Sequence, residues 1–162
     1  PPTQWLYLPA LRRVRIAPYR PEEPLLQSHY LFYDLTTILN FGDYEYRFHT
    51  ASESAPVIDG TPRPGFVPYD ATTFALERRG TTYVVTKITY QAKGQRREAE
   101  FRDYHEIAPG WFRPGQIVVR DASGHTELTF RSWVLNSAGP ELFTGTALET
   151  RNLTVPVKET SP

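Results

Sequence analysis

The residues that could bind a metal ion or act in catalysis are spread along this chain rather than grouped in a motif. Four histidines occur without any pair at the spacing of metal ligands: His29, His49, His105 and His125. Cysteine is absent, which excludes thiolate metal sites and disulfide bonds. No glycine-rich phosphate-binding loop occurs. The sequence therefore predicts no metal site and no cofactor.

Three neighbouring residues have the chemical types of a hydrolytic triad: Asp121, Ser123 and His125. They fall within one predicted hairpin turn, where turn geometry explains the Asp, Ser and Gly residues better than catalysis does. The acidic residues between 98 and 106 are interleaved with arginines, a pattern typical of cross-strand ion pairs on a solvated sheet face. We expect no enzymatic activity.

Charge and composition exclude further classes of protein. The 18 Lys and Arg residues balance 18 Asp and Glu residues, so no net field would draw the protein to nucleic acid or to an anionic membrane. No apolar stretch approaches the roughly 18 to 20 residues of a membrane-spanning helix, and no basic-then-apolar leader opens the sequence. With 162 residues and 40% hydrophobic content, one domain is predicted over residues 1–155, followed by a polar tail over 156–162.

The elements that would position these residues change character along the chain. Ten of the fifteen prolines lie before residue 71, so residues 17–24 and 59–68 are predicted to be irregular and extended. Pro9 disfavours a helix near the start, and residues 5–16 are predicted as one extended strand. One short helix is predicted within residues 30–43, from apolar residues at helical spacing. These residues are Leu31, Leu35, Ile38 and Leu39.

From about residue 72 the pattern is that of an antiparallel β-meander. Strand-like runs rich in Thr, Val, Tyr and Phe alternate with short turns that contain glycine. The runs are 72–79, 81–91, 97–107, 112–121 and 126–135. Leu128 and Phe130 share one face and Glu127 and Thr129 the other, so the sheet has one apolar and one solvated face. Such a sheet forms either a packed sandwich or a barrel with a cavity.

Several segments, taken in order, carry a family resemblance. They are QWLYLPALRRVRI from residue 4, FYDL followed by DYEYRF, GTPRPGFVPY, the meander from YVVTKITYQ to GQIVVRD, and ELFTG with TALE. This series resembles the second part of the LolA-like outer-membrane lipoprotein-sorting family, and its most specific piece is WLYLPALRRV. The resemblance implies a mainly β fold, an antiparallel, curved and incomplete β-barrel (a LolA/LolB-like half-barrel) with one short helix.

Two departures from the family pattern accompany the resemblance. Family members carry a further N-terminal helix and several strands before the segment that begins here at residue 4. Either the barrel is completed by residues that this chain lacks, or the protein is a reduced version. After RRVR this chain has IAPYRPEEPLLQSHY, where the family tends to have another basic residue and a serine-rich stretch.

The resemblance implies a non-catalytic periplasmic carrier that binds acyl chains of lipids or lipoproteins, for outer-membrane lipoprotein sorting or envelope lipid transport. An envelope transporter or an acceptor protein would then be its partner. The alternative is an envelope protein-interaction or structural β module without a ligand. An esterase acting on bound lipid is a distant third hypothesis.

A ligand-binding cavity is predicted from the apolar face and the resemblance together. Its expected lining is Trp5, Tyr7, Leu35, Ile88, Phe101, Val119, Leu128 and Phe130. For a single aromatic residue such as Phe101, plain core packing is the first interpretation and ligand contact the second. The expected cavity rim is Arg12, Arg13 and Arg15. These arginines are interpreted first as solvated edge charges that deter strand pairing, and second as contacts to a lipid headgroup or a partner.

Overall fold

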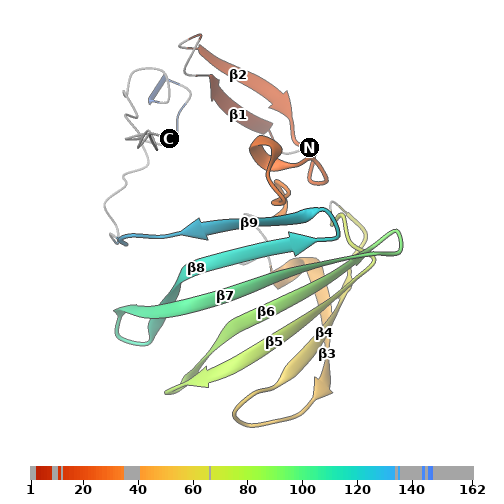
Figure 1. Cartoon of the computed structure of the whole chain (residues 1–162), viewed down its shortest axis with the longest axis vertical. Coiled ribbons are helices and arrows are strands. Elements are labelled where there is room, and N and C mark those ends of the chain that lie inside the picture. The colour runs from red at the N-terminus through yellow and green to blue at the C-terminus, as the bar shows by residue number, and fades with distance from the viewer. Residues whose placement is uncertain are drawn as a thin grey trace. The chain divides into compact units, whose positions relative to one another are not determined.

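The computed structural model describes residues 3–8, 11, 13–34, 41–65, 67–133, 135, 144 and 146–147. The chain divides into two compact units, Pro1–Tyr19 with Val134–Pro162, and Arg20–Trp133. In the first unit, β1 (Thr3–Leu8) and β2 (Arg13–Pro18) pair as an antiparallel two-stranded sheet (Figure 1).

The prediction of one continuous strand over residues 5–16 is therefore wrong. The chain reverses between β1 and β2, so that Trp5 lies opposite Ile16 and Tyr7 lies opposite Val14. Pro9 directly follows β1 in the sequence, and a proline cannot donate a ladder hydrogen bond, so a strand ends readily at this point. The alternation of apolar residues is the same for one long strand and for two paired strands, and it could not distinguish them.

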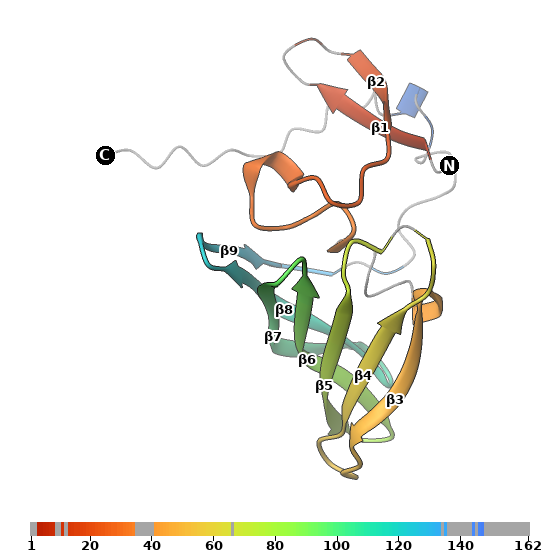
Figure 2. The ribbon, with the colours of Figure 1, turned by 90° about the vertical axis from the view of Figure 1, so that its right-hand side faces the viewer.

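The second unit is built on an open, curved antiparallel sheet (Figures 1 and 2). Each strand pairs with its neighbours in sequence, and the two outer strands do not pair with each other. The strands are β3 (Tyr44–Thr50), β4 (Val57–Pro62), β5 (Ala71–Arg79), β6 (Thr82–Ala92), β7 (Gln95–Ala108), β8 (Trp111–Asp121) and β9 (Gly124–Thr129). The prediction of a mainly β, antiparallel, incomplete barrel is confirmed.

The predicted meander matches β5 to β9 closely, although β9 ends at Thr129 rather than at 135. Strands β3 and β4 were not predicted, and residues 59–62, expected to be irregular, belong to β4. Two short 3-10 turns, η2 (Leu25–Gln27) and η3 (Phe41–Asp43), precede the sheet. Of the predicted helix, residues 35–40, including Leu35, lie outside the described residues, and Leu31 forms an isolated antiparallel bridge with Pro24.

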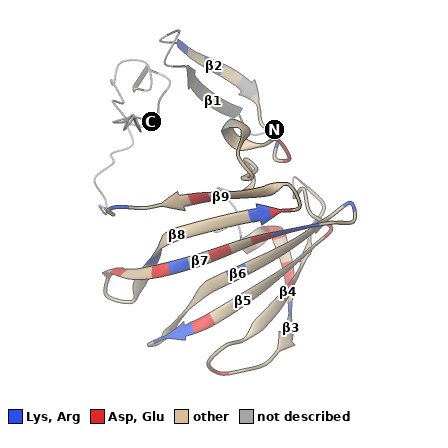
Figure 3. Ribbon diagram, viewed as in Figure 1, with Lys and Arg blue, Asp and Glu red and all other residues tan. Residues whose placement is uncertain are grey.

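The sheet has the two contrasting faces that alternation predicts. Its outer face carries ion pairs between neighbouring strands, such as Lys87 with Glu98 at 2.9 Å and Arg120 with Glu100 at 3.8 Å. Figure 3 shows acidic and basic positions interspersed along β7. Its inner face carries an unbroken series of cross-strand partners that we name the apolar row: Phe48, Ile58, Phe74, Ile88, Ala99 and Val119.

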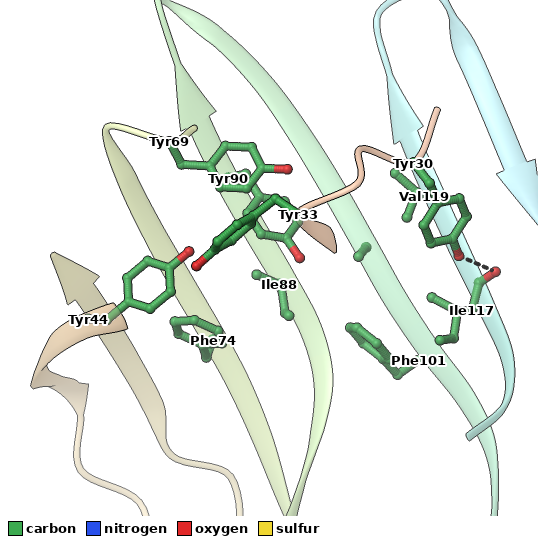
Figure 4. Packing of buried hydrophobic residues seen from close by; sticks show 11 residues of the cluster. Tyr30, Tyr33, Tyr44, Tyr69, Phe74, Ile88, Tyr90, Phe101, Ile117 and Val119 are labelled. Carbon is green, nitrogen blue, oxygen red and sulfur yellow. Dashed lines mark hydrogen bonds between the residues drawn. The ribbon is translucent and has the colours of Figure 1, made fainter. Parts of the chain in front are cut away.

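One end of the inner face is covered by residues 29–34. Tyr30 and Tyr33 are buried there among residues of the sheet (Figure 4). The Tyr30 hydroxyl donates a hydrogen bond to the Ile117 carbonyl oxygen at 3.1 Å. The His29 backbone N–H donates to Thr126 Oγ1 at 3.0 Å. These bonds attach the segment to β8 and β9, far along the sequence.

Candidate functional site

The apolar row ends in a hollow at the β3 side of the sheet. Its volume is about 370 Å³, within the range of roughly 300 to 1,000 Å³ that is typical of ligand pockets. Its lining is Phe48, Ala51, Ser52, Glu53, Pro56, Ile58, Leu76 and Tyr83. Phe48 is 72% exposed although it lies on the inner face. Apolar side chains therefore remain accessible where the row reaches the edge of the sheet.

The loop that borders this hollow is held by polar contacts to β5 and β6. The Tyr83 hydroxyl donates to the Glu53 carbonyl oxygen at 2.9 Å, and Arg78 forms an ion pair with the Glu53 carboxylate at 2.5 Å. Two backbone hydrogen bonds also join the loop to β5. The Leu76 N–H donates to the Pro56 carbonyl oxygen, and the Arg78 N–H donates to the Ser54 carbonyl oxygen. These contacts hold the loop that borders the hollow against β5 and β6.

A layer of aromatic rings lies on the inner face toward the other end of the strands, away from the β3–β4 turn that borders the hollow. Figure 4 shows these rings. Tyr69 stacks on Tyr90 with ring centroids 4.3 Å apart, and Tyr33 meets Tyr69 edge-on at 5.9 Å. Tyr44 meets Phe74 edge-on at 5.7 Å. Burial raises the pKa of Tyr69 and of Tyr90 far above the ordinary value for a phenol, with the Asp34 carboxylate adding to the effect.

A buried ion pair lies beside this aromatic layer. Arg97 contacts Asp34 at 3.0 Å, and the two side chains are only 11% and 3% exposed. The Arg97 guanidinium also donates to the Tyr69 hydroxyl and to the His29 carbonyl oxygen, and the Asp34 carboxylate accepts from Tyr69 and from the Leu31 backbone N–H. Burial opposes the charge of Arg97, but Asp34 outweighs it and the pKa of the guanidinium is raised.

A more polar groove opens at the same end, between the covering segment and the hairpins β6–β7 and β8–β9. Its volume is about 500 Å³. His29 stands at its wall, with Nδ1 at 2.8 Å from Thr126 Oγ1 and Nε2 at 3.9 Å from Asp121. Lys93 and Glu22 face each other across it at 3.8 Å. The inner face therefore runs from a polar, hydrogen-bonded end to an apolar, open one.

The described part of the inner face offers mainly apolar contact. The three residues that have the chemical types of a triad occur at the β8–β9 turn, as turn geometry predicts, and Ser123 there donates to the Asp121 carboxylate at 2.6 Å. Within the described part of the chain, no group of three or more His, Asp and Glu side chains is placed to hold a metal ion. Among those same residues no helix has the length and apolarity to cross a membrane.

The structure brings together five of the predicted ligand-binding residues. Ile88, Phe101 and Val119 are buried on the inner face, and Leu128 and Phe130 are partly buried against them. Their contact with a ligand remains a prediction.

The other predicted site residues belong to the other unit or lie outside the described residues. Trp5, 45% exposed, and Tyr7, half-buried, lie on β1 in the other unit. Arg13 and Arg15 are exposed on β2. Leu35 and Arg12 lie outside the described residues.

The sequence interpretation missed the residues at both ends of the inner face. Asp34 and Arg97 stand 63 positions apart, and neither belongs to a motif that indicates a buried pair. Phe48 and Ile58 lie in a part of the chain whose prolines concealed two strands. The alternation of Tyr44, Tyr46 and Phe48 was the available signal for β3.

Two solved structures have a fold similar to that of this chain. The chain superposes on a domain assigned to outer membrane lipoprotein sorting from Vibrio parahaemolyticus, with a TM-score of 0.78 and 20% identity, over 91% of this chain and 66% of that one. It superposes on a LolA-superfamily protein from Nitrosomonas europaea with a TM-score of 0.61 and 18% identity, over 88% of this chain and 66% of that one. The chain thus spans just under two thirds of each solved structure.

A search of curated protein sequences finds no match. A family model described as an uncharacterized protein family matches residues 2–150. The shared fold confirms the predicted resemblance at the level of architecture. The chain belongs to the family that this model defines, and it shares the fold of these two solved structures.

Proposed function

We propose that this protein is a non-catalytic periplasmic carrier that binds acyl chains of lipids or lipoproteins against the inner face of its open sheet. The observation that carries the proposal is the apolar row, which crosses six strands without a polar interruption. Phe48 at its β3 end is exposed and the four members from Phe74 onward are buried, so an acyl chain would enter from the Phe48 end. At about 4.8 Å between strands, its five steps span about 24 Å. One acyl chain occupies about 15 Å in half of a bilayer's hydrocarbon core.

Apolar contact alone supplies enough affinity for such a ligand. At about 0.8 kcal/mol per buried CH₂, a chain of about sixteen carbons contributes on the order of 12 kcal/mol before ordering costs. The open hollow lined by Phe48, Ile58 and Leu76 offers a route by which an acyl chain reaches the row from the edge of the sheet. The fold shared with the domain assigned to lipoprotein sorting supports the same class of cargo and a periplasmic location.

A matched pair of variants on β9 tests the proposal. Leu128 lies on the inner face and is partly buried, and its neighbour Thr129 is exposed on the outer face. Binding of a fluorescent fatty acid to the delipidated protein is expected to be saturable and competed by unlabelled palmitate. Leu128→Gln should weaken binding about 5- to 30-fold, which corresponds to about 1–2 kcal/mol of lost apolar contact, whereas Thr129→Gln should leave it unchanged.

Three results would contradict the carrier as proposed. Absence of saturable binding by the wild-type chain would favour an interaction module without a ligand. Equal binding by the two variants would show that the ligand does not contact the inner face at Leu128. Turnover of a chromogenic ester, abolished by substitution of a single Ser or His, would instead indicate a hydrolase. Organic extraction of the freshly purified protein provides an independent check, because a carrier should release acyl species.

A further inference from the structure

The edge strand β3 is exposed along nearly its whole length. Among the described strands it pairs only with β4, and every residue of the strand after Tyr44 is exposed. Two of these residues are large and apolar, Tyr46 at 39% and Phe48 at 72% exposure. Natural edge strands are usually shortened, charged, bulged, interrupted by proline or covered, because unpaired backbone groups recruit other strands. Strand β3 has seven residues and no proline, and its register shift lies near its end, between Phe48 and Thr50.

The charges on β3 are self-complementary. Glu45 and Arg47 point to the outer face, two positions apart on the strand. Within the described residues neither side chain forms an ion pair or a hydrogen bond. If a second copy pairs antiparallel about a two-fold axis at Tyr46, each Glu45 lies opposite an Arg47 and each Arg47 opposite a Glu45. Opposite charges at such directly facing positions stabilise strand pairs.

The same register also matches the apolar side chains. It places Phe48 of each copy opposite Tyr44 of the other, with the two Tyr46 rings at the axis. Cross-strand aromatic pairs contribute about 0.2–1 kcal/mol each. The exposed Phe48 ring would gain a neighbour on the inner face, where the apolar row now ends. A two-fold interface makes every favourable pair occur twice.

The other edge of the sheet offers less to a second copy. On β9, Glu127 already accepts a hydrogen bond from Gln116 at 2.8 Å. The Thr126 hydroxyl accepts a hydrogen bond from the His29 backbone N–H and forms a second one with Nδ1 of the His29 ring. Within Gly124–Thr129 no large hydrophobic residue is exposed. The comparison favours β3 as the associating edge.

We propose that the protein self-associates through β3, two copies pairing antiparallel with Tyr46 at the two-fold axis to form one continuous sheet. The interface is small, so association is weak, and sedimentation equilibrium from about 10 µM to 1 mM covers the expected range. The wild-type chain should show a reversible monomer–dimer equilibrium. The dimer should weaken as salt is raised, because its paired charges are exposed to solvent.

Charge reversal tests the register. Glu45→Arg and Arg47→Glu each create two like-charge contacts, and each alone should weaken dimerisation at least about tenfold. An equimolar mixture of the two variants should restore it as a heterodimer, because the reversed charges then face their opposites. The double variant Glu45→Arg/Arg47→Glu should restore the homodimer. The control Glu127→Arg on β9 should dimerise as the wild type does.

Each contrary result overturns the proposal. A wild-type chain that stays monomeric at 1 mM shows that β3 does not recruit a second copy. Single variants that dimerise like the wild type show that association uses another surface, and loss of dimers in Glu127→Arg would identify β9 as that surface. A mixture that remains monomeric excludes the register centred on Tyr46. Circular dichroism of each variant confirms that the sheet is intact.

Discussion

At the scale of single residues, the Asp34–Arg97 pair joins the covering segment to the sheet. Both side chains are nearly inaccessible to water, and each has several further hydrogen-bond partners. Removing one member of a buried pair leaves an uncompensated charge, which costs about 3–5 kcal/mol. The contribution of the intact pair to stability is smaller, since its desolvation opposes folding. The pair therefore acts mainly by specifying where residues 29–34 lie.

A comparison of adjacent arginines checks this account. Arg97→Gln is expected to lower the free energy of unfolding by about 3–5 kcal/mol. Arg96→Gln should change it by no more than about 0.5 kcal/mol, because Arg96 is 61% exposed and pairs with Glu98 on the outer face. Urea denaturation measures both. Similar midpoints for the two variants would mean that Asp34 is not held by Arg97.

At the scale of elements, the hairpin turns set the strand register. Ala92 pairs with Gln95, so β6 and β7 are joined by the two residues Lys93 and Gly94. Both have positive φ, 49° and 78°, which is the backbone of a type I′ turn. This turn twists in the same sense as the strands it connects. Glycine is suited to it because a side chain in this conformation is strained.

Substitutions in this turn should act in opposite directions. Gly94→Ala is expected to destabilise the protein by about 1–2 kcal/mol, the cost of the left-handed conformation for a residue with a Cβ atom. Lys93→Asn should stabilise it, because asparagine tolerates positive φ. Gly65→Ala is the control, since a Cβ there meets no atom within 4 Å and its φ is not positive. Thermal unfolding should give the lowest midpoint for Gly94→Ala, a wild-type midpoint for Gly65→Ala and the highest midpoint for Lys93→Asn. A neutral Gly94→Ala would contradict the assigned turn.

At the scale of the whole molecule, buried tyrosines link stability to alkaline pH. The folded state raises the pKa of Tyr69 and Tyr90 far above the value near 10 of an unfolded chain. Between these values the folded chain keeps phenolic protons that the unfolded chain releases. Their contribution is therefore complete below about pH 10 and is lost as pH rises further, at about 1.4 kcal/mol per pH unit for each phenol.

Urea denaturation from about pH 8 to pH 12 is expected to show stability falling above about pH 10. Tyrosinate absorbance should rise together with the loss of the folded circular dichroism signal. Tyr90→Phe removes one of the buried phenols with a raised pKa and should make the decline shallower. Stability that stays constant to about pH 12 would show that these phenols ionise within the folded protein.

Much of the fold followed from local patterns in the sequence. Turn residues and the alternation of apolar and polar side chains predicted β5 to β9, their antiparallel pairing and a charged outer face. Alternation depends only on neighbouring residues, which is why it could be interpreted without a structure. Ile88, Phe101 and Val119 were assigned to the apolar face in this way, and they are buried together.

Only the tertiary structure decided how distant segments meet. The reversal after Leu8, the pairing of β3 with β4, and the contact of Asp34 with Arg97 all join residues whose local sequence is compatible with other arrangements. The apolar row depends on the register of six strands at once, so no single strand predicts it. The sequence alone determined that an apolar sheet face exists, because side-chain alternation is a local property. The structure determined which end of that face is covered and which end is open, because burial depends on long-range contacts.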